Sequence, residues 1–374
     1  MKLAMLSQDD NPKKIPAAVF MDTAAVELRV VQHKSGQDVS NLLEFILAGA
    51  EVWEDTFAHV KINSTGMMLS RCKIHAPVEQ PLSIRDFYAF EQHVKTANKN
   101  RGRPVPPEWY EMPVFYFSNP RSIYGPGDTI PYPRNSDALD YELEIACIIG
   151  KEGRDIPADK AEEYIFGYMI FNDWSARDIQ KKEMRVGLGP AKGKDFASSF
   201  GPYLVTPDEL EKKSAGRPGV YDLQMVARVN GVERSRGNWK DLHYSFGEMI
   251  ARASENVTLY PGDAIGSGTV GTGCLLELTK GEGPWLQPGD VVELEVEELG
   301  ILRNVIGAKP DAHKPLTESE TEAVAIITSE PKPVVKVEST SGAPDKSDAK
   351  PETKPDAASE SEAETGDETD SDTN

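Results

Sequence analysis

Three acidic residues of this chain stand in stretches that otherwise have the composition of buried β-strands. Glu142 and Glu144 begin an apolar run that continues to Ile149, and Asp173 follows the apolar run Tyr164 to Phe171. An ionised carboxylate is costly to bury unless a partner compensates its charge. The fold must therefore bring something positive to these positions, and a hard divalent cation is the simplest candidate.

The spacing of these acids favours one shared metal site. Residues two apart on a strand point to the same face, so Glu142 and Glu144 lie together while Leu143 points into the packing. Two like charges about 7 Å apart repel each other unless a cation lies between them. Asp173 would be a third ligand, and Asp86 on an upstream segment a fourth. Four oxygen ligands favour Mg²⁺, Mn²⁺ or Ca²⁺ over zinc or copper. The alternative is a solvated strand face.

The composition indicates a soluble protein that folds without disulfides. The chain has 374 residues, of which 39% are hydrophobic, and can bury the core of one large domain or two ordinary ones. Its three cysteines form no C-x-x-C pair, which favours a reducing cytoplasm. The apolar start is too short for a signal peptide, and no stretch approaches the roughly 18 apolar residues of a membrane span. The net charge of −20 argues against nucleic acid as a partner.

Three regions are expected along the chain. Residues 1–80 form a small N-terminal subdomain, residues 81–310 form the main domain with the acidic residues, and residues 315–374 form a disordered acidic tail. The tail carries sixteen acidic residues against five lysines and almost no aromatic residues, so it cannot bury enough surface to offset the cost of ordering. A solubilising appendage is the simpler interpretation, and a regulatory or partner-binding tail is the alternative.

Turn and strand patterns predict a strand-rich α+β fold with antiparallel and mixed sheet. The tripeptide Pro-Gly-Asp occurs three times, beginning at Pro126, Pro261 and Pro288, and each copy precedes an apolar or alternating run. Such a tripeptide is typical of a turn that leads into a strand. Val291 to Val296 alternates as a strand with one buried face does. Helices are expected at residues 158–164 and around residues 239–253.

A further helix is expected over residues 83–100, because Phe90 and Val94 fit helical spacing and Ser83 or Asp86 could cap its start. His93 would follow Asp86 by about two helical turns, so both side chains would line one side of a cleft. Tyr88 and Gln92 add polar groups to the same segment. The alternative is a histidine with a purely structural role.

Two glycine-rich segments do not predict a nucleotide site. Residues 266–271 match the pattern G-x-G-x-x-G, but a dinucleotide site needs a helix directly after it, and residues 274–278 are predicted as a strand. Residues 187–195 lack the spacing of a phosphate loop. The chain also has no G-x-S-x-G elbow, which argues against a serine hydrolase.

Taken together, these segments resemble the fumarylacetoacetate hydrolase family over roughly Asp86 to Val305. The likeness rests on five segments in the family's order, which are Asp86–His93 (D-F-Y-A-F-E-Q-H), Asp140–Glu144 (D-Y-E-L-E), Asn172–Gln180, Gly193–Lys194 and Gly268–Leu278. The resemblance implies a mixed β-sandwich or β-roll core and a homodimer. Residues 1–80 do not resemble the barrel-like domain of the animal fumarylacetoacetases.

The resemblance also implies a role for individual residues. The metal ligands that it implies are Asp86, Glu142, Glu144 and Asp173, in agreement with the charge argument. For catalysis it implies that His93 activates water, that Glu277 orients the imidazole, and that Lys194 and Gln180 stabilise oxyanion charge. The residues that would help to seat the substrate are Tyr88, Tyr116, Arg177 and Thr269. An arginine that grips the substrate falls at Arg101 or Arg103.

The leading hypothesis is a metal-dependent hydrolase that cleaves a carbon–carbon bond of a β-diketo acid, of the fumarylacetoacetate or acylpyruvate type. The first alternative is a decarboxylase or isomerase of a 2-oxo diacid, of the oxaloacetate or hydroxymuconate type, because a metal that stabilises an enolate serves those reactions equally well. The second alternative is a non-catalytic metal-binding or interaction protein. Retention of both His93 and Glu277 favours attack by water.

Overall fold

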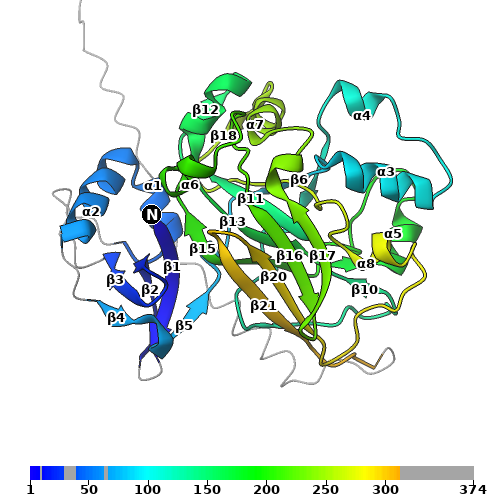
Figure 1. Ribbon diagram of the computed structural model, residues 1–374, viewed down its shortest axis with the longest axis horizontal. Helices are drawn as coiled ribbons and strands as arrows, with labels where there is room; N and C mark the ends of the chain where they lie inside the picture. The colour runs from blue at the N-terminus through cyan, green and yellow to red at the C-terminus, as the bar shows by residue number, and fades with distance from the viewer. Residues whose placement is uncertain (9–10, 29–38, 63–65, 312–374) are drawn as a thin grey trace, which may run out of the picture. The chain divides into compact units, whose positions relative to one another are not determined.

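The computed structural model describes residues 1–8, 11–28, 39–62 and 66–311 (Figure 1). The predicted disordered tail at residues 315–374 lies outside these ranges. Among the helices that the structure describes, none is long and apolar enough to cross a membrane.

A large sheet of twelve strands runs through the molecule. Its order is β4-β3-β2-β1-β15-β13-β11-β19-β6-β7, with β5 beside β1 and β8 beside β15. The strands are β1 (Lys2–Gln8), β2 (Asn11–Phe20), β3 (Ala24–Glu27), β4 (Met67–Met68), β5 (Cys72–His75), β6 (Ile84–Phe87), β7 (Phe115–Ser118), β8 (Ile123–Tyr124), β11 (Leu143–Ile149), β13 (Ile165–Asp173), β15 (Ser198–Val205) and β19 (Ala264–Gly266).

A second sheet of five strands packs against the middle of the first (Figure 1). Its strands, in order, are β17 (Val232–Asn238), β16 (Gln224–Val229), β20 (Val291–Val296), β21 (Gly300–Ile306) and β9 (Thr129–Ile130). Two short pairs complete the strands, β10 (Leu139–Asp140) with β14 (Ser175–Ala176) and β12 (Gly153–Arg154) with β18 (Thr258–Leu259). Strand β20 alternates buried and half-buried side chains, as predicted.

Helices lie around these sheets. They are α1 (Leu42–Leu47), α2 (Ala50–Ile62), α3 (Glu91–Asn100), α4 (Glu108–Glu111), α5 (Arg177–Glu183), α6 (Pro207–Leu210), α7 (Phe246–Ser254) and α8 (Leu275–Leu278). Within the described residues, short 3₁₀ helices span Leu69–Arg71, Ala158–Tyr164, Glu211–Lys213 and Trp239–Asp241. The helix predicted at residues 158–164 is thus confirmed as a 3₁₀ helix. The helix predicted around residues 239–253 consists of a 3₁₀ turn followed by α7. Ser245 and Glu248 form a capping box at the start of α7.

The central strands are covered on both faces, which explains their nearly unbroken apolar runs. Ile145 and Ile170 share one hydrophobic cluster with Met225 and Leu294 of the second sheet. The opposite face of the same strands belongs to another cluster, which includes residues of α1. All side chains of β11 and β13 are buried, including those of Glu144 and Asp173. The expected strand-rich α+β architecture is confirmed.

Each Pro-Gly-Asp tripeptide makes the same turn before a strand, as predicted. The glycines Gly127, Gly262 and Gly289 have positive φ angles of 79°, 95° and 87°, which a side chain would strain. The aspartate of each turn accepts a hydrogen bond from the backbone N–H three residues earlier, at 2.7 to 2.9 Å. Strands β9, β19 and β20 follow directly.

Two local predictions are wrong. Residues 84–87 form strand β6 rather than the start of a helix, and α3 begins only at Glu91 with Phe90 as its N-cap residue. Asp86 therefore lies on a strand and His93 on a helix, and neither Ser83 nor Asp86 caps α3. Residues 275–278 form the short helix α8 rather than a strand. A single turn of this kind still lacks the long helix that a dinucleotide site needs.

Residues 1–80 contribute strands to the same large sheet as the rest of the described chain. Strand β1 pairs antiparallel with β15, with Leu3 opposite Leu204. The division of the chain at residue 80 into a subdomain and a main domain stays a prediction.

Candidate active site

Three of the four predicted metal ligands converge in the large sheet. Asp86 on β6, Glu144 on β11 and Asp173 at the end of β13 each offer a carboxylate oxygen, and these oxygens lie within 4.8 Å of one another. All three side chains are buried. Strand β19 separates β6 from β11, so the pairing of four strands produces this convergence.

A glycine on the intervening strand makes room for Asp86. Gly266 lies opposite Asp86 in the parallel pairing of β19 with β6. A Cβ atom at position 266 would come within 2.4 Å of Asp86 Oδ1, so any other residue there would displace the carboxylate. The backbone N–H of Gly268 donates to the same oxygen at 3.2 Å. Gly266 and Gly268 thus accommodate and bind the carboxylate of Asp86 rather than a nucleotide.

The electrostatics of the three carboxylates fit a divalent cation. Burial, reinforced by the neighbouring acids, raises the pKa of Asp86 and of Glu144 well above the ordinary values. Burial also raises the pKa of Asp173, although Lys194 opposes it. Two buried oxygens, Glu144 Oε2 and Asp173 Oδ1, have no hydrogen-bond partner among the described residues. Buried oxygen atoms that lack a hydrogen-bond donor and lie near other acids are suitable ligands for a hard cation.

Glu142 lies beside this group with its oxygens directed to two cations. Arg177 Nη2 donates to Glu142 Oε1 at 2.9 Å, and Lys194 Nζ donates to Glu142 Oε2. Burial would raise the pKa of Glu142, but Arg177 and Lys194 outweigh it and hold that pKa well below its ordinary value. Glu142 is therefore ionised next to the other acids. Its role as a fourth metal ligand stays a prediction.

Lys194 links Glu142 to the other carboxylates. Its buried ammonium also donates to Asp173 Oδ2. Burial disfavours this charge, but Asp173 and Glu142 hold the pKa of Lys194 above its ordinary value. Gly193 brings the lysine close to α5, because a Cβ atom there would lie 2.8 Å from the backbone nitrogen of Gln180. The predicted oxyanion lysine is thus a permanent positive charge inside the site.

Asp140 is a buried residue of the site for which the sequence predicted no role. Arg177 Nε donates to Asp140 Oδ2 at 2.9 Å, and Asp140 accepts the backbone N–H groups of Leu275 and Leu276 at 2.8 and 3.0 Å. It therefore fixes the first turn of α8 to the arginine that holds Glu142. Its two-residue spacing from Glu142, the spacing that also relates Glu142 to Glu144, is the signal that could have identified it.

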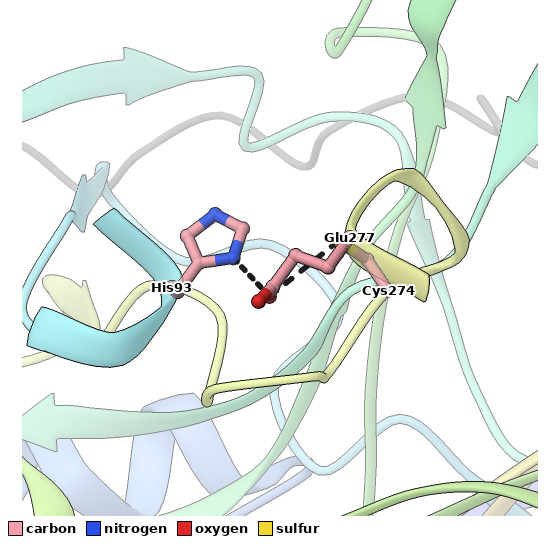
Figure 2. Close-up of side chains that lie close together, drawn as sticks. All are labelled: His93, Cys274 and Glu277. Atoms are coloured by element: carbon pink, nitrogen blue, oxygen red, sulfur yellow. Dashed lines mark hydrogen bonds and ion pairs between the residues drawn. The ribbon is translucent and has the colours of Figure 1, made fainter. Parts of the chain in front are cut away.

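The predicted base and its orienting carboxylate form a buried pair. His93 Nδ1 and Glu277 Oε1 are hydrogen-bonded, and the other ring nitrogen of His93 points away from Glu277 (Figure 2). Glu277 Oε2 accepts the backbone N–H of Thr272 at 3.1 Å, which fixes the carboxylate. The ring of Tyr88 lies edge-on to the imidazole, with centroids 5.2 Å apart. His93 is also close enough to Glu142 to lower its pKa.

The remaining predicted residues lie around these groups. Tyr116 donates its hydroxyl to Asp173 Oδ2, and Thr269 Oγ1 donates to Glu144 Oε1 at 3.2 Å. Gln180 Oε1 accepts from Arg177 Nη1 at 3.1 Å. Tyr88 is partly buried, and the burial of its hydroxyl raises the pKa of that group, an effect that Arg101 opposes and Glu142 reinforces. The structure therefore brings all twelve predicted residues into one region.

A cavity of about 560 Å³ adjoins this region, between the end of α3 and helices α5 and α8. Its charged lining is mostly basic, although the chain as a whole is acidic, and comprises Arg101, Arg103, Arg177, Lys181, Arg185 and Lys280, with Asp178 as the acidic member. Asp178 is engaged by Ser136 and by the backbone N–H of Asp137. The cavity thus offers a positively charged entrance beside Gln180.

A family model described as "Fumarylacetoacetate (FAA) hydrolase C-terminal" matches residues 83–307. The 2,4-didehydro-3-deoxy-L-rhamnonate hydrolase of Sphingomonas sp. (strain SKA58) is 34% identical over 220 residues, which cover 58% of this chain and 70% of that protein. The oxaloacetate tautomerase of Bacillus subtilis is 32% identical over 245 residues, which cover 64% of this chain and 74% of that protein.

Solved structures share the fold. The fumarylacetoacetate hydrolase of Exiguobacterium antarcticum matches with a TM-score of 0.63 and 28% identity, covering 83% of this chain and all of that one. The maleylpyruvate hydrolase of Sphingobium sp. SYK-6, solved with manganese(II) and pyruvate, matches with a TM-score of 0.61 and 22% identity. This match also covers 83% of this chain and all of that one.

Proposed function

Since this chain belongs to the fumarylacetoacetate hydrolase family, we propose that it is a divalent-metal-dependent hydrolase. Its substrate would be a β-diketo acid of the fumarylacetoacetate or acylpyruvate type, and the bond that it cleaves a carbon–carbon bond. One observation carries this proposal: the hydrogen-bonded His93–Glu277 pair lies close to Glu142, which Lys194 links to a converging group of carboxylates.

The metal would be held by Asp86, Glu144 and Asp173, with Glu142 as the fourth ligand. Their oxygen atoms suit Mg²⁺, with Mn²⁺ and Ca²⁺ as the alternatives. When bound, such a cation polarises the carbonyl oxygens of a β-diketo acid and stabilises the enolate that leaves. The two oxygens without partners, on Glu144 and Asp173, support this assignment.

His93 would act as the general base through the ring nitrogen that points away from Glu277. The carboxylate of Glu277 holds the proton on Nδ1, which leaves the other nitrogen free to accept a proton from water. Because Thr272 fixes Glu277, the imidazole keeps one orientation. The arrangement of a base with an orienting carboxylate is common to many hydrolases.

Hydrolysis would then proceed by addition of water, cleavage of the carbon–carbon bond and protonation of the enolate. Water adds to the acyl carbonyl carbon as its proton passes to His93. The carbon–carbon bond breaks, and its electron pair enters the enolate of the departing 2-oxo acid. His93 returns the proton to the enolate carbon, so that the products are a carboxylic acid and a 2-oxo acid. Lys194 and Gln180 would stabilise the negative charge that develops on oxygen.

The substrate would be seated by Tyr88, Tyr116, Arg177 and Thr269. The basic cavity beside Gln180 supports an anionic substrate, because its cationic side chains raise the local concentration of anions. We further propose that the enzyme acts in the cytoplasm and as a homodimer.

An isomerase or decarboxylase acting on a 2-oxo diacid is the second candidate. The similarity to an oxaloacetate tautomerase favours it, because that reaction also proceeds through an enol and needs no attacking water. A tautomerase would need one group that moves a proton at carbon, a role open to His93. Cleavage of an acylpyruvate into a carboxylic acid and a 2-oxo acid distinguishes the hydrolase from both an isomerase and a decarboxylase.

A panel of substrates tests these candidates. Acylpyruvates, fumarylacetoacetate and oxaloacetate would each be incubated with the full chain, once with Mg²⁺ and once with excess chelator, and the products identified by mass spectrometry. The hydrolase proposal predicts two acid products from a β-diketo acid, with turnover lost in chelator and restored by Mg²⁺. Turnover of oxaloacetate alone would favour the second candidate and contradict the first.

A further inference from the structure

A second group of potential metal ligands meets at the proposed base. A ring nitrogen of His93, Cys274 Sγ and a carboxylate oxygen of Glu277 lie within 4.8 Å of one another, and all three side chains are buried. Figure 2 shows the three side chains together. The thiol of Cys274 also contacts Glu277 Oε1 at 3.9 Å. Cys274 has no part in the proposed hydrolysis, so its position beside the base calls for a separate explanation.

The donor atoms of this group differ from those of the carboxylate group. Sulfur, imidazole nitrogen and one carboxylate oxygen are typical zinc ligands, with bonds of about 2.0 to 2.3 Å in a tetrahedral arrangement. Such bonds place neighbouring ligand atoms about 3 to 4 Å apart, and these three atoms, all within 4.8 Å of one another, would reach that spacing by small side-chain movements. Mg²⁺ and Ca²⁺ prefer oxygen ligands alone, so the two groups would select different ions.

We propose that His93, Cys274 and Glu277 form an inhibitory site for a thiophilic divalent cation such as Zn²⁺. The bound ion replaces the hydrogen bond between His93 and Glu277. The imidazole can then no longer be oriented as the base that the proposed function requires. Binding itself does not rest on the proposed function; only the inhibition does.

Local structure supports this chelate. Cys274 is the N-cap residue of α8 and Glu277 lies three residues later, so both side chains face α3 from one turn of the chain. Asp140 fixes that turn through two backbone hydrogen bonds. A thiolate and a carboxylate would neutralise the charge of the ion in this buried place. The cavity lined by Ala97 and Leu276 reaches between α3 and α8 and offers a route of entry.

Cobalt(II) provides a direct test of binding, because a thiolate ligand gives it a strong near-ultraviolet charge-transfer band that oxygen ligands do not give. The full chain, kept in excess Mg²⁺ to fill the carboxylate group, would be titrated with Co²⁺. We expect the band to saturate at one equivalent per chain in the wild type and to be absent from Cys274→Ser, which keeps a hydrogen-bonding group but loses the sulfur. Cys72→Ser is the matched control, because Cys72 lies on β5 and bonds the backbone oxygen of Met68.

Inhibition is measured separately, as the Zn²⁺ concentration that halves each variant's own turnover. Loss of one ligand should raise this concentration at least about 10-fold in Cys274→Ser and leave it unchanged in Cys72→Ser. A cobalt band that persists in Cys274→Ser, or that the wild type lacks, would overturn the site. Equal zinc sensitivity of both variants would overturn its inhibitory role. Since the cobalt band reports binding without turnover, failure of the proposed function would not obscure the result.

Discussion

Asp140 and Arg177 form a buried ion pair, with Nε 2.9 Å from Oδ2, that connects the two halves of the site. On one side, Asp140 accepts the backbone N–H groups that begin α8, the helix of Glu277. On the other, Arg177 holds Glu142. The pair therefore ties the helix of the orienting carboxylate to the group of acids that would bind the metal.

Substitution of Asp140 should damage both stability and turnover. Asp140→Asn keeps the shape of the side chain but leaves Arg177 with one buried partner fewer, and breaking a buried pair in this way costs about 3 kcal/mol. The free energy of unfolding, measured in urea, should fall by about that amount, and turnover should fall as α8 loses its anchor. In the control Asp222→Asn, which breaks an exposed pair with Lys240, the unfolding midpoint should barely move. An unchanged midpoint in Asp140→Asn would contradict this role.

Replacement of His93 should abolish hydrolysis and spare the metal. In His93→Ala the loss of the base should lower kcat by about 10² to 10⁴. Mg²⁺ binding, measured by isothermal titration calorimetry, should persist because the carboxylates are untouched. His243→Gln is a control outside the site, because His243 packs against the ring of Trp109. Turnover of His93→Ala near that of the wild type would rule out His93 as the base.

Neutralising an acid of the converging group should have opposite effects on metal binding and on metal-free stability. Glu144→Gln replaces a carboxyl whose ionisation is disfavoured by burial and by the neighbouring acids with a neutral amide, so the metal-free protein should unfold at a higher temperature. Mg²⁺ affinity should nevertheless fall at least about 100-fold, because a ligand is lost. Glu142→Gln should also weaken binding, but it should lower metal-free stability, since Arg177 and Lys194 lose their partner. A Mg²⁺ titration unchanged in both variants would exclude them from the ligand set.

Stability should depend on pH in a way that the metal reverses. The folded-state pKa values of Asp86, Glu144 and Asp173 are raised, so their contribution to stability is complete below the unfolded values of 3.8 and 4.5 and is lost as pH rises through the folded values. Glu142, whose pKa is lowered, acts in the opposite sense, but three groups outweigh one. In chelator the melting temperature should therefore fall as pH rises above about 4.5.

Added Mg²⁺ binds the ionised carboxylates, so it should restore more of the melting temperature at pH 8 than at pH 5. Scanning calorimetry across this range, with and without the ion, would measure the difference. A gain from Mg²⁺ that does not grow with pH would contradict the charge assignment.

The sequence predicted much of the site because buried acids are costly wherever they occur. Glu144 and Asp173 could be recognised from the apolar runs around them, without knowledge of which strands pair. The resemblance then supplied the role of His93 and its partner Glu277, whose contact depends on α3 and α8 meeting across 184 positions of the chain. No local pattern indicates such a contact.

The errors arose where tertiary packing decides the local structure. Residues 84–87 and α3 share helical spacing of apolar side chains, but pairing of β6 with β7 and β19 makes the first of them a strand. Residues 275–278 are apolar enough for a strand, but the carboxylate of Asp140 begins a helix there. Asp140 was missed as a site residue because its partners Arg177, Leu275 and Leu276 lie far from it in the sequence.

The most direct test of the central claim is the anomalous diffraction of Mn²⁺ in crystals of the full chain grown in its presence. We predict a peak about 2.0 to 2.6 Å from oxygens of Asp86, Glu144 and Asp173, on the side of the sheet where His93 lies. The account would be contradicted by a Mn²⁺ peak only at another place, or by the absence of a peak at these carboxylates when the Mn²⁺ concentration is one that supports turnover.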